Sequence, residues 1–163
     1  MFIAAIVFII SGKGVHMEIV DLKDQLEEPA IRKLLALSIG FPTPMQIKRL
    51  CETYRSHEAW QILGYKQNNH VSACIGLQIK RGGSAHIHHL SVIPDERHQG
   101  IGRRMIEEIC RRFSLKHLTA ETEGEGAEFY RHCGFEVKKM GEAYLGVDRF
   151  SCERGQTRVP SET

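Results

Sequence analysis

Two glycines and three arginines lie close together in the segment SVIPDERHQGIGRRMIEEI, which begins at residue 91. An apolar stretch precedes them and an amphipathic helix pattern follows, so Gly100 and Gly102 stand where a strand leads into a helix. At such a junction several backbone N–H groups meet at the positive end of the helix dipole, and glycine has no Cβ to obstruct an approaching phosphate. Arg97, Arg103 and Arg104 add positive charge. The segment therefore predicts a local anion cradle suited to a pyrophosphate.

Two better-known phosphate motifs are excluded. The dinucleotide pattern G-x-G-x-x-G requires glycine where Met105 stands. SGKG at residues 11–14 is similar to the end of a P-loop, but Val7 occupies the place of the required glycine and Gly14 replaces the Ser or Thr. The strand-to-helix junction is therefore the anion site that the sequence predicts.

Three histidines precede the cradle in the strand-like run AHIHHLSVI. Alternate side chains of a strand share a face, so His86 and His88 are predicted on one face and His89 on the other. Imidazole is a base near neutral pH and a common zinc ligand. The run is similar to the start of the HxHxDH motif of metallo-β-lactamase-like hydrolases, but His89 and Leu90 stand where Asp and His are needed. No metal is expected, and a His-rich metal-binding protein remains an alternative.

Hydrophobic periodicity predicts the elements that position these residues. Strands are predicted at 17–20, 59–67, 70–80, 85–93 and 116–121, helices at 28–39, 45–56, 100–113 and 126–133, and two closing strands within 135–150 that turn around Gly141. The strand–helix–strand unit from about 85 to 120 implies one parallel pairing inside a mixed sheet. We expect an α/β fold with a mostly antiparallel sheet of six to seven strands and about four helices.

The chain of 163 residues has the size of one domain. Its apolar start, FIAAIVFII, is too short to span a bilayer as a helix. We interpret residues 1–16 as an apolar extension upstream of a natural start at Met17, residues 17–152 as the folded domain, and residues 153–163 as a polar tail.

Charge and cysteine content exclude several classes of protein. The 22 basic and 20 acidic residues are well mixed, so no overall field favours nucleic acid. The five cysteines form no CxxC pair, which argues against a disulfide framework or zinc ribbon and favours the reducing cytoplasm. No membrane partner is expected, and exposed edge strands with the apolar N-terminal segment are compatible with a homodimer.

The glycine junction resembles the signature Q/R-x-x-G-x-G/A of the GNAT superfamily of N-acetyltransferases, which Arg97, Gly100 and Gly102 match. About 30 residues later, AEFYRHCGFE is similar to the family's second motif, a short helix with Phe-Tyr followed by Gly-Phe. The order of elements from Met17 to about Phe150 is also similar. The resemblance implies a V-shaped splay between strands four and five. It further implies acetyl-CoA as cosubstrate and direct attack of a primary amine on it in a ternary complex.

The resemblance also assigns roles to single residues. Tyr130 would be the general acid that protonates the departing CoA thiolate. His86 stands eleven residues before the signature Arg97, where some members carry a carboxylate base, and would accept the ammonium proton directly or through water; a water chain without a dedicated base is the alternative. The implied cofactor-binding residues are the strand positions Leu90, Ser91 and Val92 and the cradle positions Arg97, His98, Gln99, Gly100, Ile101, Gly102 and Arg103.

The acceptor is expected to be a small-molecule or peptide amine, bound near the loop around residues 41–45, the second helix and the last two strands. A non-catalytic acyl-CoA sensor, which keeps the cradle without turnover, is the alternative from a different functional class.

Overall fold

The computed structural model describes residues 17–155. The predicted apolar extension at 1–16 and residues 156–163 of the predicted tail lie outside the described residues. The elements in chain order are β1 (Met17–Asp21), α1 (Pro29–Leu37), α2 (Pro44–Ser56), β2 (Trp60–Gln67), β3 (His70–Lys80), β4 (Ser84–Val92), α3 (Ile101–Arg112), β5 (His117–Glu123), α4 (Gly126–His132), β6 (Glu136–Tyr144) and β7 (Val147–Gly155). Short 3-10 turns at Lys23–Gln25 and Pro94–Glu96 precede α1 and α3.

The strands form one seven-stranded sheet in the order β1-β2-β3-β4-β5-β7-β6. Neighbouring strands are antiparallel except β4 and β5, which are parallel. Parallel neighbours need a crossover connection, and α3 supplies it. The predicted mixed, mostly antiparallel sheet with four helices is confirmed. Within residues 17–155 no helix combines the length and apolar character that a membrane span requires.

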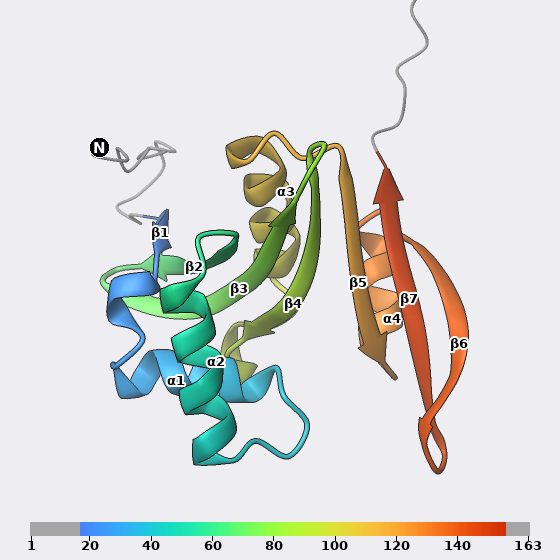
Figure 1. Ribbon diagram of the computed structural model, residues 1–163, viewed down its shortest axis with the longest axis horizontal. Coiled ribbons are helices and arrows are strands. Elements are labelled where there is room, and N and C mark those ends of the chain that lie inside the picture. The colour runs from blue at the N-terminus through green and yellow to red at the C-terminus, as the bar shows by residue number, and fades with distance from the viewer. Residues whose placement is uncertain (1–16, 156–163) are drawn as a thin grey trace, which may run out of the picture.

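Helices cover both faces of the sheet, with α1 and α2 on one face and α3 behind it (Figure 1). On the α3 side, Met105, Ile106 and Ile109 are fully buried against the sheet at 0% exposure. Each such side chain contributes about 1.5–3 kcal/mol through burial. On the other face, Tyr54 of α2 is fully buried in a second hydrophobic cluster. The sheet is therefore fixed from both sides at its centre, where β4 lies.

The sheet opens between β4 and β5. These strands pair over only four positions, from Ser84 opposite His117 to Ile87 opposite Ala120, and then diverge (Figure 1). The predicted V-shaped splay is confirmed. It leaves the second half of β4 without a neighbour on its β5 side, directly before the turn that leads into α3.

A bulge interrupts β4 inside the splay. Gly76 of β3 lies opposite His89, and the next residue, Leu77, lies opposite Ile87, so His88 is an extra residue in β4. A bulge turns the residues that follow it relative to the regular alternation. Consequently the strand periodicity used to assign side chains to faces fails at this point of β4.

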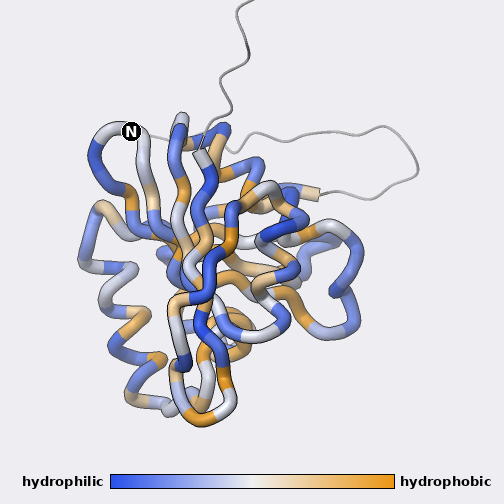
Figure 2. Tube along the Cα trace, turned by 90° about the vertical axis from the view of Figure 1, so that its right-hand side faces the viewer, coloured by the Kyte–Doolittle hydropathy of each residue, from blue (hydrophilic) through white to orange (hydrophobic). Residues whose placement is uncertain are grey.

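The closing hairpin differs from the prediction, and the predicted turn around Gly141 is wrong. Gly141 has a φ of +135° at a register shift in β6, while the turn falls at Leu145 and Gly146, where Gly146 has a φ of +78°. Glycine marks a bulge as readily as a turn, and the sequence pattern did not separate the two. Viewed from the β6 side, the hairpin tip carries apolar residues (Figure 2), and Leu145 is 97% exposed. β7 continues to Gly155, past the predicted domain boundary at residue 152.

Candidate functional site

The predicted anion cradle lies at the N-terminus of α3. His98 has a φ of +63° and Gly100, the N-cap residue, a φ of +79°, so the chain passes through two left-handed residues before the helix begins. No side chain caps this helix end. The first amides of α3, from Ile101 to Arg103, therefore remain as donors at the positive end of the helix dipole. That geometry fits a phosphate group.

The two signature glycines have different structural roles. Gly100 faces open space, since a Cβ there would meet no atom within 4 Å. Gly102 lies against α4, because a Cβ there would come within 2.9 Å of the Phe129 ring. Gly100 therefore keeps the cradle open, and Gly102 lets α3 approach α4 closely.

The backbone groups that point into the splay belong to two of the three predicted strand residues. The Ile93 amide donates to the Ser72 carbonyl of β3 at 2.8 Å, and in an antiparallel strand alternate residues point their backbone groups in opposite directions. Leu90 and Val92 therefore point theirs away from β3, into the splay. The Nε of Arg97 donates to the Val92 carbonyl at 2.9 Å, which agrees with this orientation and fixes Arg97 to the end of β4.

The third predicted strand residue, Ser91, uses its polar group elsewhere. Its hydroxyl donates to the Leu34 carbonyl of α1 at 2.6 Å and lies 3.4 Å from the Cys74 Sγ. Ser91 thus fastens β4 to α1, and a contact with pantetheine stays a prediction for it.

The three histidines of β4 lie on one face of the sheet. Nδ1 of His86 is 2.7 Å from the Thr119 hydroxyl, and His88 stacks on Trp60 with ring centroids 4.3 Å apart. His89 was predicted on the opposite face, and this prediction is wrong. The bulge turns it to the α2 face, where its Nδ1 lies 2.7 Å from the Tyr54 hydroxyl.

Burial is the main influence on the pKa of these three histidines. It lowers the pKa of His86, with a further lowering from the charge of Lys80. It lowers the pKa of both His88 and His89 to about 4. All three imidazoles are therefore neutral at neutral pH, and His86 is able to accept a proton. No cluster of three His, Cys, Asp or Glu side chains suited to a metal occurs in residues 17–155.

The predicted general acid, Tyr130, lies in the α3–α4 core and is 7% exposed. Its ring packs edge-on against Phe129 and Phe135, with centroids 5.2 and 5.0 Å away. Burial raises the pKa of the phenol, and the nearby thiols of Cys152 and Cys133 raise it further. The phenol therefore stays protonated throughout the physiological range, as a proton donor must.

One charged residue of the splay was missed in the sequence. Glu121 is the first β5 residue beyond the β4–β5 pairing, and its carboxylate accepts from Arg149 of β7 at 2.6 Å. Its negative charge raises the pKa of His86 and His88, against the effect of burial, so it lies on the histidine face. The sequence shows only a glutamate near the end of a strand. Its place at the splay follows from the strand register, which no local signal encodes.

Comparison with known proteins agrees with this geometry. The family model described as an acetyltransferase (GNAT) domain matches residues 58–137, which run from β2 into β6. An uncharacterized N-acetyltransferase in the lysA 3′ region of Bacillus methanolicus is 33% identical over 69 residues, 40% of this chain. The match spans 58% of that relative's length.

Two solved structures share the fold. The ribosomal-protein-S18-alanine N-acetyltransferase of Escherichia coli aligns with a TM-score of 0.69 and 18% identity, over 90% of this chain and 98% of that one. A GNAT family acetyltransferase of Elizabethkingia anophelis with acetyl-CoA bound aligns with a TM-score of 0.59 and 15% identity, over 88% and 99% of the two chains. With the family model over residues 58–137, the splayed sheet and the signature at the start of α3, the chain carries a GNAT acetyltransferase domain.

Proposed function

We propose that the protein is an N-acetyltransferase that transfers acetyl from acetyl-CoA to a primary amine by direct attack in a ternary complex. The observation that carries the proposal is the continuity of the splay with the cradle. The unpaired half of β4 leads within a few residues to the uncapped N-terminus of α3. The five cysteines are free, which supports the reducing cytoplasm as its location.

The residues of the splay and the cradle fit acetyl-CoA. The backbone groups of Leu90 and Val92 would pair with the amides of the pantetheine arm, as a neighbouring strand would. The amides of Ile101 to Arg103 would hold the pyrophosphate, where Gly100 leaves space for it. When bound, acetyl-CoA supplies an activated acetyl thioester.

Three parts of the chain would then serve the chemistry. An amide of Leu90 or Val92 would donate to the thioester carbonyl oxygen and stabilise the negative charge that develops on it. Tyr130 would protonate the departing thiolate. His86 would take the proton of the amine, directly or through water, and Glu121 would attract the amine in its ammonium form.

Binding and turnover measurements together test this proposal. Calorimetric titration with acetyl-CoA measures the affinity of the cradle for the cosubstrate. Acetyl transfer is measured by the release of CoA in the presence of polyamines, amino sugars, amino acids or peptide N-termini, and mass spectrometry identifies the acetylated product. Binding together with an acetylated amine supports the proposal. Binding without product on any amine would favour the non-catalytic sensor, and absence of binding would overturn both.

A further inference from the structure

In residues 17–155, the large apolar side chains that are exposed gather on two segments, which we call the apolar rim. One segment is the end of α1 with the loop into α2, and the other is the β6–β7 hairpin. The side chains are Leu37, Phe41 and Met45 on the first segment, and Met140, Tyr144 and Leu145 on the second. Single exposed apolar residues are common, but a concentration of them marks a binding surface. Both segments lie at the lower end of the view in Figure 1, toward which β4 and β5 diverge.

The first segment of the rim is fixed to the β4 side of the splay. The Ser91 hydroxyl donates to the Leu34 carbonyl, in the last turn of α1, at 2.6 Å. In a regular α-helix the amide of Ser38 would donate to this carbonyl, but it donates to the Leu35 carbonyl instead, at 3.1 Å. Ser91 therefore takes the place of that amide, and this contact sets where the loop begins beside β4.

The loop between α1 and α2 holds Phe41 outward. At the far end of the loop, Thr43 caps α2 through reciprocal hydrogen bonds with Gln46. Phe41 lies between the two fixed ends, with a left-handed φ of +56° and an exposed fraction of 86%. A residue with a Cβ adopts this conformation only at an energetic cost, and such residues are concentrated at ligand sites. The ring is therefore positioned for contact with a molecule outside the fold.

The second segment of the rim is fixed to the β5 side of the splay. The Tyr144 hydroxyl donates to the carboxylate of Glu123, the last residue of β5, at 3.3 Å. Glu121 and Glu123 lie on the same face of β5 and share Arg149, whose guanidinium is 2.6 Å from the first carboxylate and 3.6 Å from the second. Two carboxylates against one guanidinium leave a negative charge, which favours an ammonium group beside the hairpin.

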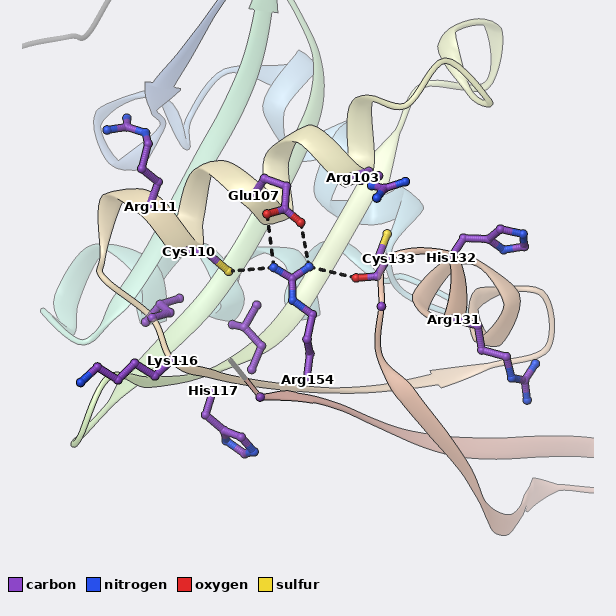
Figure 3. A pocket seen from close by; sticks show the side chains of 14 residues that line it. Arg103, Glu107, Cys110, Arg111, Lys116, His117, Arg131, His132, Cys133 and Arg154 are labelled. Carbon is purple, nitrogen blue, oxygen red and sulfur yellow. Dashed lines mark hydrogen bonds and ion pairs between the residues drawn. The ribbon is translucent and has the colours of Figure 1, made fainter. Parts of the chain in front are cut away.

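A cavity of about 740 Å³ on the α3 face of the sheet is less suited to an ammonium group. The second half of α3, the end of α4 and the ends of β5 and β7 that meet there enclose it (Figure 3). Glu107 is the acid among its lining residues, and Arg154 donates to this carboxylate at 2.8 Å and to the Cys133 carbonyl at 2.9 Å. Because the carboxylate is already paired, an amine in its ammonium form is favoured at the splay instead.

The apolar rim is open, because Phe41 and Leu145 are 86% and 97% exposed. A small molecule usually binds in a cavity that covers most of its surface, whereas a peptide can lie along an open surface and reach both segments. We propose that the acceptor is the N-terminal amine of a peptide whose first side chains are apolar, and that Phe41 and Leu145 contact those side chains. This inference rests on the proposed function.

Acetylation of two hexapeptides by the full chain tests the inference. One peptide begins Phe-Leu and the other Ser-Asn, and both continue Gly-Ser-Gly-Ser. We expect kcat/KM to be at least about tenfold higher for the Phe-Leu peptide, because its first side chains gain free energy on leaving water. Phe41→Ser and Leu145→Ser should each lower this value at least about threefold, without changing the value for the Ser-Asn peptide or the affinity for acetyl-CoA. Phe41→Leu, which keeps an apolar side chain, should retain most of the preference.

Other results would contradict the inference. Equal kcat/KM values for the two peptides, or an unchanged preference in both serine variants, would overturn it while leaving the proposed function intact. Faster transfer to hexylamine than to the Phe-Leu peptide would assign the rim to a small apolar amine and overturn the peptide acceptor. Binding of acetyl-CoA without transfer to any amine would overturn the proposed function and the inference together.

Discussion

The Tyr54 hydroxyl lies 2.7 Å from Nδ1 of His89, and this contact joins α2 to the bulge in β4. Tyr54 is fully buried, and its hydroxyl occupies the space that a Cβ on Gly76 would need, at 1.9 Å. The residue after His89 is Leu90, whose backbone faces the splay. The contact therefore fixes the stretch of strand that presents its amides to the proposed thioester.

Removing this hydroxyl should both destabilise the fold and slow the reaction. Tyr54→Phe leaves the half-buried His89 imidazole without its partner, at a cost of about 1–3 kcal/mol in the free energy of unfolding. Urea denaturation measures this cost. Steady-state kinetics should show a lower kcat with little change in the affinity for acetyl-CoA. Tyr65→Phe is the control, because Tyr65 is also buried but its hydroxyl makes no hydrogen bond within residues 17–155; equal losses in both variants would contradict the role of the contact.

A large side chain at Gly100 should block the cradle. Gly100→Phe introduces a side chain where the pyrophosphate is proposed to bind and should weaken acetyl-CoA binding at least about a hundredfold. The positive φ adds a conformational cost of about 1–2 kcal/mol. Gly82→Phe is a matched control, since Gly82 has a φ of +75° and also faces open space, but lies in the β3–β4 turn. Calorimetry should show normal binding in the control, and normal binding in Gly100→Phe would refute the cradle.

Loss of the phenol of Tyr130 should affect chemistry rather than binding. Tyr130→Phe should lower kcat about 10²-fold or more, the usual contribution of a general acid, while acetyl-CoA affinity stays within about twofold. Because burial raises the pKa of this phenol, its deprotonation should leave no alkaline limb in the rate profile below pH 10. Turnover equal to the wild type would exclude Tyr130 as the acid.

The carboxylate of Glu121, the first β5 residue beyond the β4–β5 pairing, should increase the reactivity of positively charged acceptors. Glu121→Gln removes the charge and keeps the shape, and should lower kcat/KM for an ammonium acceptor about tenfold without changing acetyl-CoA affinity. Glu136→Gln on exposed β6 is the control and should behave as the wild type. An equal effect of both changes would indicate a general effect of surface charge instead of a local one.

Stability should depend on pH through His88 and His89 of β4. The folded pKa of His88 and of His89 is about 4, below the value near 6.5 of the unfolded chain, so between these values the unfolded state binds more protons. The free energy of unfolding should therefore rise as the pH increases from 4 to about 6.5 and then level off. Urea titrations at each pH measure the slope. His89→Gln should reduce it, and His70→Gln, a change of an exposed histidine, should not.

The sequence predicted those features that local patterns encode. The apolar face of α3 and the glycines at its start predicted this helix and its role as a crossover between two strands. The crossover in turn predicted the parallel pairing of β4 with β5. The face of His89 was not predicted, because the bulge arises from the register with β3. Glu121 was missed for the same kind of reason, since its place at the splay depends on where two distant strands stop pairing.

The short β4–β5 ladder has a mechanical consequence. In residues 17–155, four paired positions of β4 and β5 connect a half-sheet of four strands to one of three. The amides of Lys116 and His117 add hydrogen bonds to the Gly83 carbonyl at the closed end, and Gly102 packs against Phe129. A molecule bound along the splay would bridge the two halves where the protein itself does not. Ligand binding should therefore slow amide hydrogen exchange at Leu118 and Ala120 of β5. The bound substrate would then stabilise the contact between the two half-sheets in addition to taking part in the reaction.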